Sequence, residues 1–115
     1  MKEDKRRFKR YRCEIAAEFA MYTEKTRNGK GVIKNAGLGG IRLQMKTNPV
    51  PEAVFALKTD PKRLSKYVDY NRIILDPEEN PLIRVVHSRK DSRTQRTFNV
   101  GARFMVKPGM RDDLD

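Results

Sequence analysis

The sequence predicts an all-β fold: an antiparallel β-barrel of six or seven strands that occupies a single domain. Three observations lead to this prediction. Short runs of alternating apolar and polar residues recur along the chain, which is typical of half-buried strands. Turn signals rich in Gly, Pro, Asn and Asp separate these runs at intervals of about eight to twelve residues. The 115 residues show no internal repeat and suffice for one modest core.

The predicted strands follow one another with a recognisable break after each. They are residues 13–23, 31–35, 40–45, 53–58, 72–75, 82–89 and 97–106. In the first run every second residue from Cys13 to Met21 is apolar, so we expect one face of that strand to be buried. Asn28-Gly29 is a hairpin signal after it. The large apolar residues expected in the core of the later runs are Ile41, Leu43, Phe55, Leu57, Val100 and Phe104.

The segments between these runs are irregular or charged. The stretch 59–71 is the least regular, and Pro61 predicts a helical turn near its start. Residues 88–96 predict a basic hairpin loop before the last strand. Closing the sheet into a barrel would remove its exposed edges.

The positive charge of the chain is concentrated at its N-terminus. Overall, 26 Lys and Arg stand against 15 Asp and Glu, a net charge of +11, and the first twelve residues hold seven of the cations with two acids. Such a segment repels itself, so we expect a flexible basic arm over residues 1–12. The barrel is expected at 13–108 and a polar tail at 109–115. A chain this basic is expected to bind an anionic partner: a nucleotide, a nucleic acid or a membrane surface.

Several classes of protein are disfavoured. No run of 18 apolar residues is present, and the basic start is not followed by an apolar stretch, so we expect neither a membrane span nor a secretory signal. The single cysteine, Cys13, suits a reducing cytosol, so we expect a cytoplasmic protein. His87 has no acids or cysteines at ligand spacing, so no metal site is expected. No nucleophile–base pair or paired carboxylate is apparent, so we expect no catalytic residues and no enzymatic activity.

Three motifs follow one another along the chain. Arg6 and Arg10 form an RxxxR pair before the first predicted strand, residues 35–40 read NAGLGG, and residues 100–104 read VGARF. An arginine pair alone carries little information in so basic a chain. The order and spacing of all three resemble the PilZ domain family, over roughly residues 6–106.

The resemblance implies a PilZ-like β-barrel and a receptor for the bacterial second messenger cyclic di-GMP. The implied ligand-binding residues are Arg6, Arg7, Arg10, Asn35, Gly37, Gly39 and Gly40. Arg7, which precedes Phe8, is compatible with a ligand bound as a monomer or as an intercalated dimer. The segment 59–80 matches the family least.

The residue types suit this ligand. Arginine offers a bidentate fork for phosphate oxygens and for the O6/N7 edge of guanine. Asn35 offers an acceptor and donors to a base without repelling phosphate. The glycines permit positive φ and a close approach of backbone amides to an anion. Gly37 departs from the family pattern, which has Ser there, and one lost hydroxyl would weaken binding by about 0.5–1.5 kcal/mol.

Three functions remain open on this basis. The first is a sensor in which cyclic di-GMP orders the arm, and the ordered surface is recognised by a downstream partner protein. The second is non-specific binding of RNA or single-stranded DNA, which the scarcity of aromatic residues for base stacking disfavours. The third is a PilZ-like adaptor that binds no ligand, because Gly37 replaces the serine of the family pattern.

Overall fold

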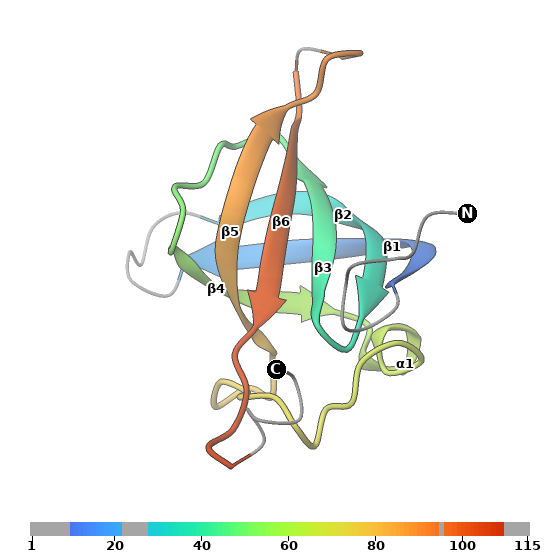
Figure 1. The fold of residues 1–115 in the computed structure, drawn as a ribbon, viewed down its shortest axis with the longest axis vertical. Coiled ribbons are helices and arrows are strands. Elements are labelled where there is room, and N and C mark those ends of the chain that lie inside the picture. Colours follow the sequence, from blue (N-terminus) through green and yellow to red (C-terminus); the bar gives the residue numbers. More distant parts are fainter. Residues whose placement is uncertain (1–9, 22–27, 95, 110–115) are drawn as a thin grey trace, which may run out of the picture.

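The computed structural model describes residues 10–21, 28–94 and 96–109, and they form an all-β fold with one short helix (Figure 1). The strands are β1 (Arg10–Met21), β2 (Asn28–Gly37), β3 (Gly40–Met45), β4 (Val54–Thr59), β5 (Leu82–Lys90) and β6 (Phe98–Phe104). The helix, α1, spans Pro61–Leu64. The all-β prediction is therefore confirmed.

The six strands pair antiparallel, and the sheet closes on itself. Neighbouring strands follow the order β1-β2-β3-β6-β5-β4 in a closed barrel. The closing contact joins Ala17–Met21 of β1 to Phe55–Thr59 of β4. In Figure 1, β3, β6 and β5 form the front of this ring and cross over β1. The ring encloses the core and leaves an outer face.

The core fills the interior through the alternation that the sequence predicted. In β1, Ile15, Ala17 and Phe19 are at most 5% exposed, and the Phe19 ring meets Phe55 of β4 edge to face at 6.3 Å. The six residues predicted to be buried in the later strands are all buried, at no more than 6% exposure. Cys13 is half-buried and packs against this core.

β1 begins three residues earlier than predicted. Arg10, Tyr11 and Arg12, assigned to the arm from their charge, pair with Gly37, Ala36 and Asn35 of β2. Backbone pairing with a neighbouring strand therefore outweighs the repulsion among the basic side chains. The rest of the predicted arm, residues 1–9, lies outside the described residues.

The predicted turn at Asn28-Gly29 is wrong. Both residues belong to β2, opposite Ala20 and Phe19 of β1. A Cβ atom on Gly29 would lie 3.8 Å from the Phe19 ring, an ordinary contact, so close packing does not require glycine at this position. The long pairing of β1 with β2 outweighs the local turn preference, and their connection falls within 22–27, outside the described residues.

Residues 72–75 do not form the predicted strand. They make only isolated bridges, Ile73 with Val106 and Leu75 with Pro81. The chain turns immediately afterwards, because the Asp76 carboxylate accepts hydrogen bonds from the backbone N–H groups of Glu78 and Asn80. The run is therefore too short for a ladder to develop.

The predicted helical turn after Pro61 is confirmed as α1. The Asp60 carboxylate accepts a hydrogen bond from the Lys62 N–H at 2.9 Å, and Pro61 takes the first helical position. Arg63 Nη2 then donates to the Glu14 carbonyl of β1 at 3.0 Å, which holds α1 against the start of the ring. None of the helical structure described here is long and apolar enough to cross a membrane.

Candidate ligand-binding face

The glycine-rich segment 35–40 forms the end of β2, a tight turn and the start of β3. Leu38 and Gly39 make the turn, and Gly37 pairs directly with Gly40. The backbone does not adopt the left-handed conformation that these glycines permit. Positive φ angles among the described residues occur instead at Glu52, Glu79 and Gly109.

Gly40 is required by close packing. A Cβ atom at this position would overlap the carbonyl oxygen of Ala102 in β6 and would lie 3.2 Å from Arg10 Nη2. Arg10 also pairs with Gly37 across β1 and β2. The arginine of the first motif and two glycines of the second, far apart in the chain, are therefore in one place.

Asn35 lies in a row of paired residues that crosses four strands. Arg12 of β1 pairs with Asn35, Asn35 pairs with Arg42 of β3, and Arg42 pairs with Gly101 of β6. The Asn35 Oδ1 atom is buried, and no hydrogen-bond donor reaches it. An unsatisfied buried acceptor costs about 1–3 kcal/mol, so a ligand that supplies a donor here would recover that cost.

The face around this row is strongly positive. Arg12, Arg42 and Arg103 are exposed, and within the described part of the chain no ion pair involves Arg42 or Arg103. Arg84 pairs with Arg103 across β5 and β6, and its Nη1 atom forms a long ion pair of 3.6 Å with Glu52 Oε2. We refer to the outer surface formed by Arg10, Arg12, Asn35, Gly37, Gly40, Arg42, Gly101 and Arg103 as the arginine face.

The sequence motifs identified only part of the arginine face. Of the predicted residues, Arg10, Asn35, Gly37, Gly39 and Gly40 lie at the β1–β2–β3 end of the ring, whereas Arg6 and Arg7 lie outside the described residues. Arg12, Arg42 and Arg103 were not assigned to the site. Arg42 and Arg103 each stand between two buried residues of a strand, so alternation alone places them on the outer face.

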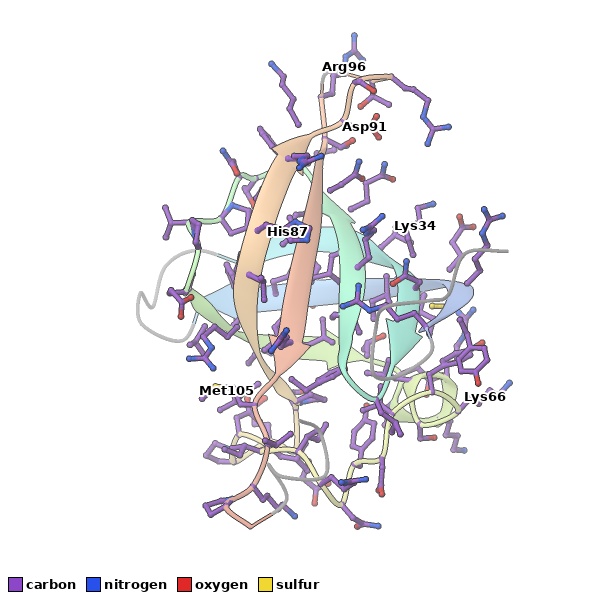
Figure 2. All side chains as sticks on the ribbon, in the orientation of Figure 1. Lys34, Lys66, His87, Asp91, Arg96 and Met105 are labelled. Atoms are coloured by element: carbon purple, nitrogen blue, oxygen red, sulfur yellow. The ribbon has the colours of Figure 1, made fainter. Side chains whose placement is uncertain are left out.

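Gly101 leaves room for a side chain of the neighbouring strand. The His87 ring of β5 lies across it, so a Cβ atom on Gly101 would overlap the imidazole (Figure 2). The pairing of β5 with β6 shifts register between Val85 and His87, which is the mark of a bulge. His87 thereby covers Gly101 on the outer side of the sheet, within the arginine face.

Cys13 lies at a second irregularity, where the pairing of β1 with β2 shifts between Arg12 and Ile15. Its thiol contacts the Ile33 carbonyl at 3.7 Å. Burial raises the pKa of the Cys13 thiol above its ordinary value, and the neighbouring Arg63 lowers it less. A protonated thiol is a poor nucleophile, which agrees with a packing role.

The two close-packed glycines are expected to respond differently to the same small substitution. Gly40→Ala should lower the free energy of unfolding by about 1–3 kcal/mol, because the obstacle is the backbone of β6. Gly101→Ala should stay within about 1 kcal/mol of the unmodified protein, because the exposed His87 side chain can rotate away. Urea unfolding followed by circular dichroism measures both, and equal losses would contradict the difference in packing.

Comparison with known proteins adds no family to this description. A scan against models of protein families gave no match, and no curated protein matched the chain.

Proposed function

We propose that this chain is a non-enzymatic receptor for cyclic di-GMP, which binds on the arginine face. The observation that carries the proposal is the position of Arg10, whose guanidinium lies against Gly40 at the β2–β3 turn. The three motifs of the sequence thus contribute to one outer surface, since Gly101 pairs with Arg42 beside them. Arg6 and Arg7 would complete the site from the N-terminal segment.

The chemistry of the arginine face suits a doubly charged cyclic dinucleotide. Guanidinium groups bind phosphate oxygens and the O6/N7 edge of guanine through paired hydrogen bonds, and they stack on bases. The Asn35 Oδ1 atom has no hydrogen-bond donor. Rotation of the Asn35 side chain would turn this atom towards a bound guanine, whose N–H groups could donate to it. Phosphate and base would therefore both find partners on this surface.

The proposed output is an ordered N-terminal segment. Arg10 is the first residue of β1, so the chain that carries Arg6 and Arg7 enters the barrel directly at the proposed site. A ligand clasped by these arginines would fix that segment against the ring and create a new surface for a partner protein.

Calorimetric titration of the folded protein with cyclic di-GMP tests the proposal. We expect saturable binding, with cyclic di-AMP much weaker because it has the same phosphates but lacks the guanine edge. No heat at high micromolar cyclic di-GMP would reject the receptor. If the unmodified protein gives no heat of binding but the Gly37→Ser variant binds cyclic di-GMP, the chain is instead an adaptor that no longer binds the ligand.

A further inference from the structure

The connection between β5 and β6, described at residues 91–94, 96 and 97, projects from the end of the ring that lies away from α1 (Figure 1). The strands that carry it remain paired up to Lys90 and Phe98. Among the arginine-face residues of β6, Gly101 lies three residues from Phe98, or roughly 10 Å along an extended strand, and Arg103 lies five residues away, or roughly 17 Å. The two surfaces can therefore be changed independently.

Asp91 organises this connection from within. It is 3% exposed, and its carboxylate accepts hydrogen bonds from the Arg93 N–H at 2.8 Å and from Gln44 Nε2 at 2.9 Å. Its own N–H donates to the Thr97 carbonyl at 2.8 Å. The hydrogen bond from the Arg93 backbone is the main reason why the pKa of Asp91 lies below its ordinary value, so the carboxylate is ionised at neutral pH. These hydrogen bonds hold Asp91, Arg93 and Thr97 together at the base of the connection.

The surface of the connection is cationic. Arg89, Lys90, Arg93 and Arg96 are exposed, and Arg96 lies at the outer end of the connection (Figure 2). Asp91, the one acid between them in the sequence, is buried. Lys46, which follows β3 where Met45 pairs with Phe98, adds an exposed cation at the same end. We refer to Lys46, Arg89, Lys90, Arg93 and Arg96 as the basic tip.

The basic tip offers charge without a stacking surface. Residues 89–97 contain no Phe, Tyr or Trp, and Phe98 is partly buried against the core. Proteins that hold single strands stack the bases on aromatic side chains, so the tip is poorly suited to them. Double-stranded DNA presents paired rows of phosphates, and its major groove admits a two-stranded β-ribbon. The deep, narrow major groove of duplex RNA does not.

We propose that the basic tip binds the phosphate backbone of double-stranded DNA, as a second anion-binding surface independent of the arginine face. Each cation that neutralises a phosphate contributes about −0.9 to the slope of log K against log salt concentration. Contacts from Arg89, Lys90, Arg93 and Arg96 would together give a slope of about −3 to −4.

Fluorescence anisotropy of a labelled 20-base-pair duplex, over a series of salt concentrations, tests this proposal. The tip variant R89Q/K90Q/R93Q/R96Q, which keeps Lys46, should bind at least tenfold more weakly at low salt, with the slope reduced to about −1. The matched control R12Q/R42Q/R84Q/R103Q loses the same charge from the arginine face and from Arg84, which pairs with Arg103, and should keep both the affinity and the slope. Circular dichroism checks that both variants are folded.

Several results would overturn the proposal. Equal losses in the two variants would mean that net charge alone attracts DNA. If single-stranded DNA or duplex RNA binds as tightly as the DNA duplex, the β5–β6 ribbon does not recognise the DNA duplex. Displacement of the duplex by poly-glutamate at equal charge concentration would point to an acidic protein as the partner. None of these results bears on cyclic di-GMP binding, which the tip variant should retain.

Discussion

Replacement of Phe19 by alanine is expected to lower the free energy of unfolding by about 3–5 kcal/mol. Phe19 is 1% exposed and lies in the half of β1 that pairs with both β2 and β4. Its ring contacts Phe55 edge to face and covers Gly31, where a Cβ atom would come within 2.8 Å of it. Truncation would leave a cavity at the point where the ring closes.

The expected loss is a large part of the total, since small domains are stable by only about 5–15 kcal/mol. Urea unfolding followed by circular dichroism measures it, and Phe19→Leu provides a milder variant if the alanine variant does not fold. Glu18→Ala is the matched control, because Glu18 is exposed in the same strand and should change stability by no more than about 0.5 kcal/mol. A loss below about 1 kcal/mol for Phe19→Ala would contradict the central position of this ring.

Replacement of Arg10 by alanine is expected to weaken cyclic di-GMP binding by about 10- to 100-fold while the protein stays folded. Arg10 is partly exposed at the start of β1, and its guanidinium lies against Gly40. Hydrogen bonds to charged groups contribute about 1.5–3 kcal/mol, and each 1.4 kcal/mol is a factor of ten in affinity. Calorimetry compares the variant with the unmodified protein.

Two further variants separate the causes of that effect. Arg10→Lys keeps the charge but loses the planar fork, so it should recover only a small part of the affinity. Arg96→Ala removes an exposed arginine at the opposite end of the ring and should leave the affinity unchanged. If Arg10→Ala binds as tightly as the unmodified protein, Arg10 is not part of the site, whatever the other arginines do.

The fold could be predicted from sequence wherever alternation was unbroken. The bounds of β3 coincide with the predicted run because glycine precedes it and Lys46-Thr47-Asn48 ends its apolar phase. Prediction failed where long-range pairing opposed a local signal. Asn28-Gly29 is a turn sequence, but both residues belong to β2 because they pair with β1. Arg10 is a charged residue, but it belongs to β1 because it pairs with β2. These pairings join residues far apart in the sequence, so a short stretch of sequence cannot reveal them.

The candidate site shows the same division. The segment 35–40 was found from sequence because its glycines and asparagine are adjacent in the chain. Arg12 and Arg42 belong to the arginine face through pairing with Asn35 from either side. That relation depends on the register of three strands, and the bulges between Arg12 and Ile15 and between Ile33 and Asn35 shift it. A count of residues along the sequence therefore cannot give it.

The two halves of β1 are held in different ways. The half that ends at Met21 has a backbone partner on both sides, whereas Arg10 to Arg12 pair with β2 alone. Between them, the carbonyls of Glu14 and Ala16 are covered by the side chains of Arg63 and Thr59. Side-chain hydrogen bonds of this kind break at lower free-energy cost than the backbone hydrogen bonds between paired strands. We therefore expect amide hydrogen exchange to be fastest near Arg10, while the pairing of β1 with β4 remains intact. A ligand bound on the arginine face would then slow amide exchange at the N-terminal end of β1 and leave exchange in the core unchanged.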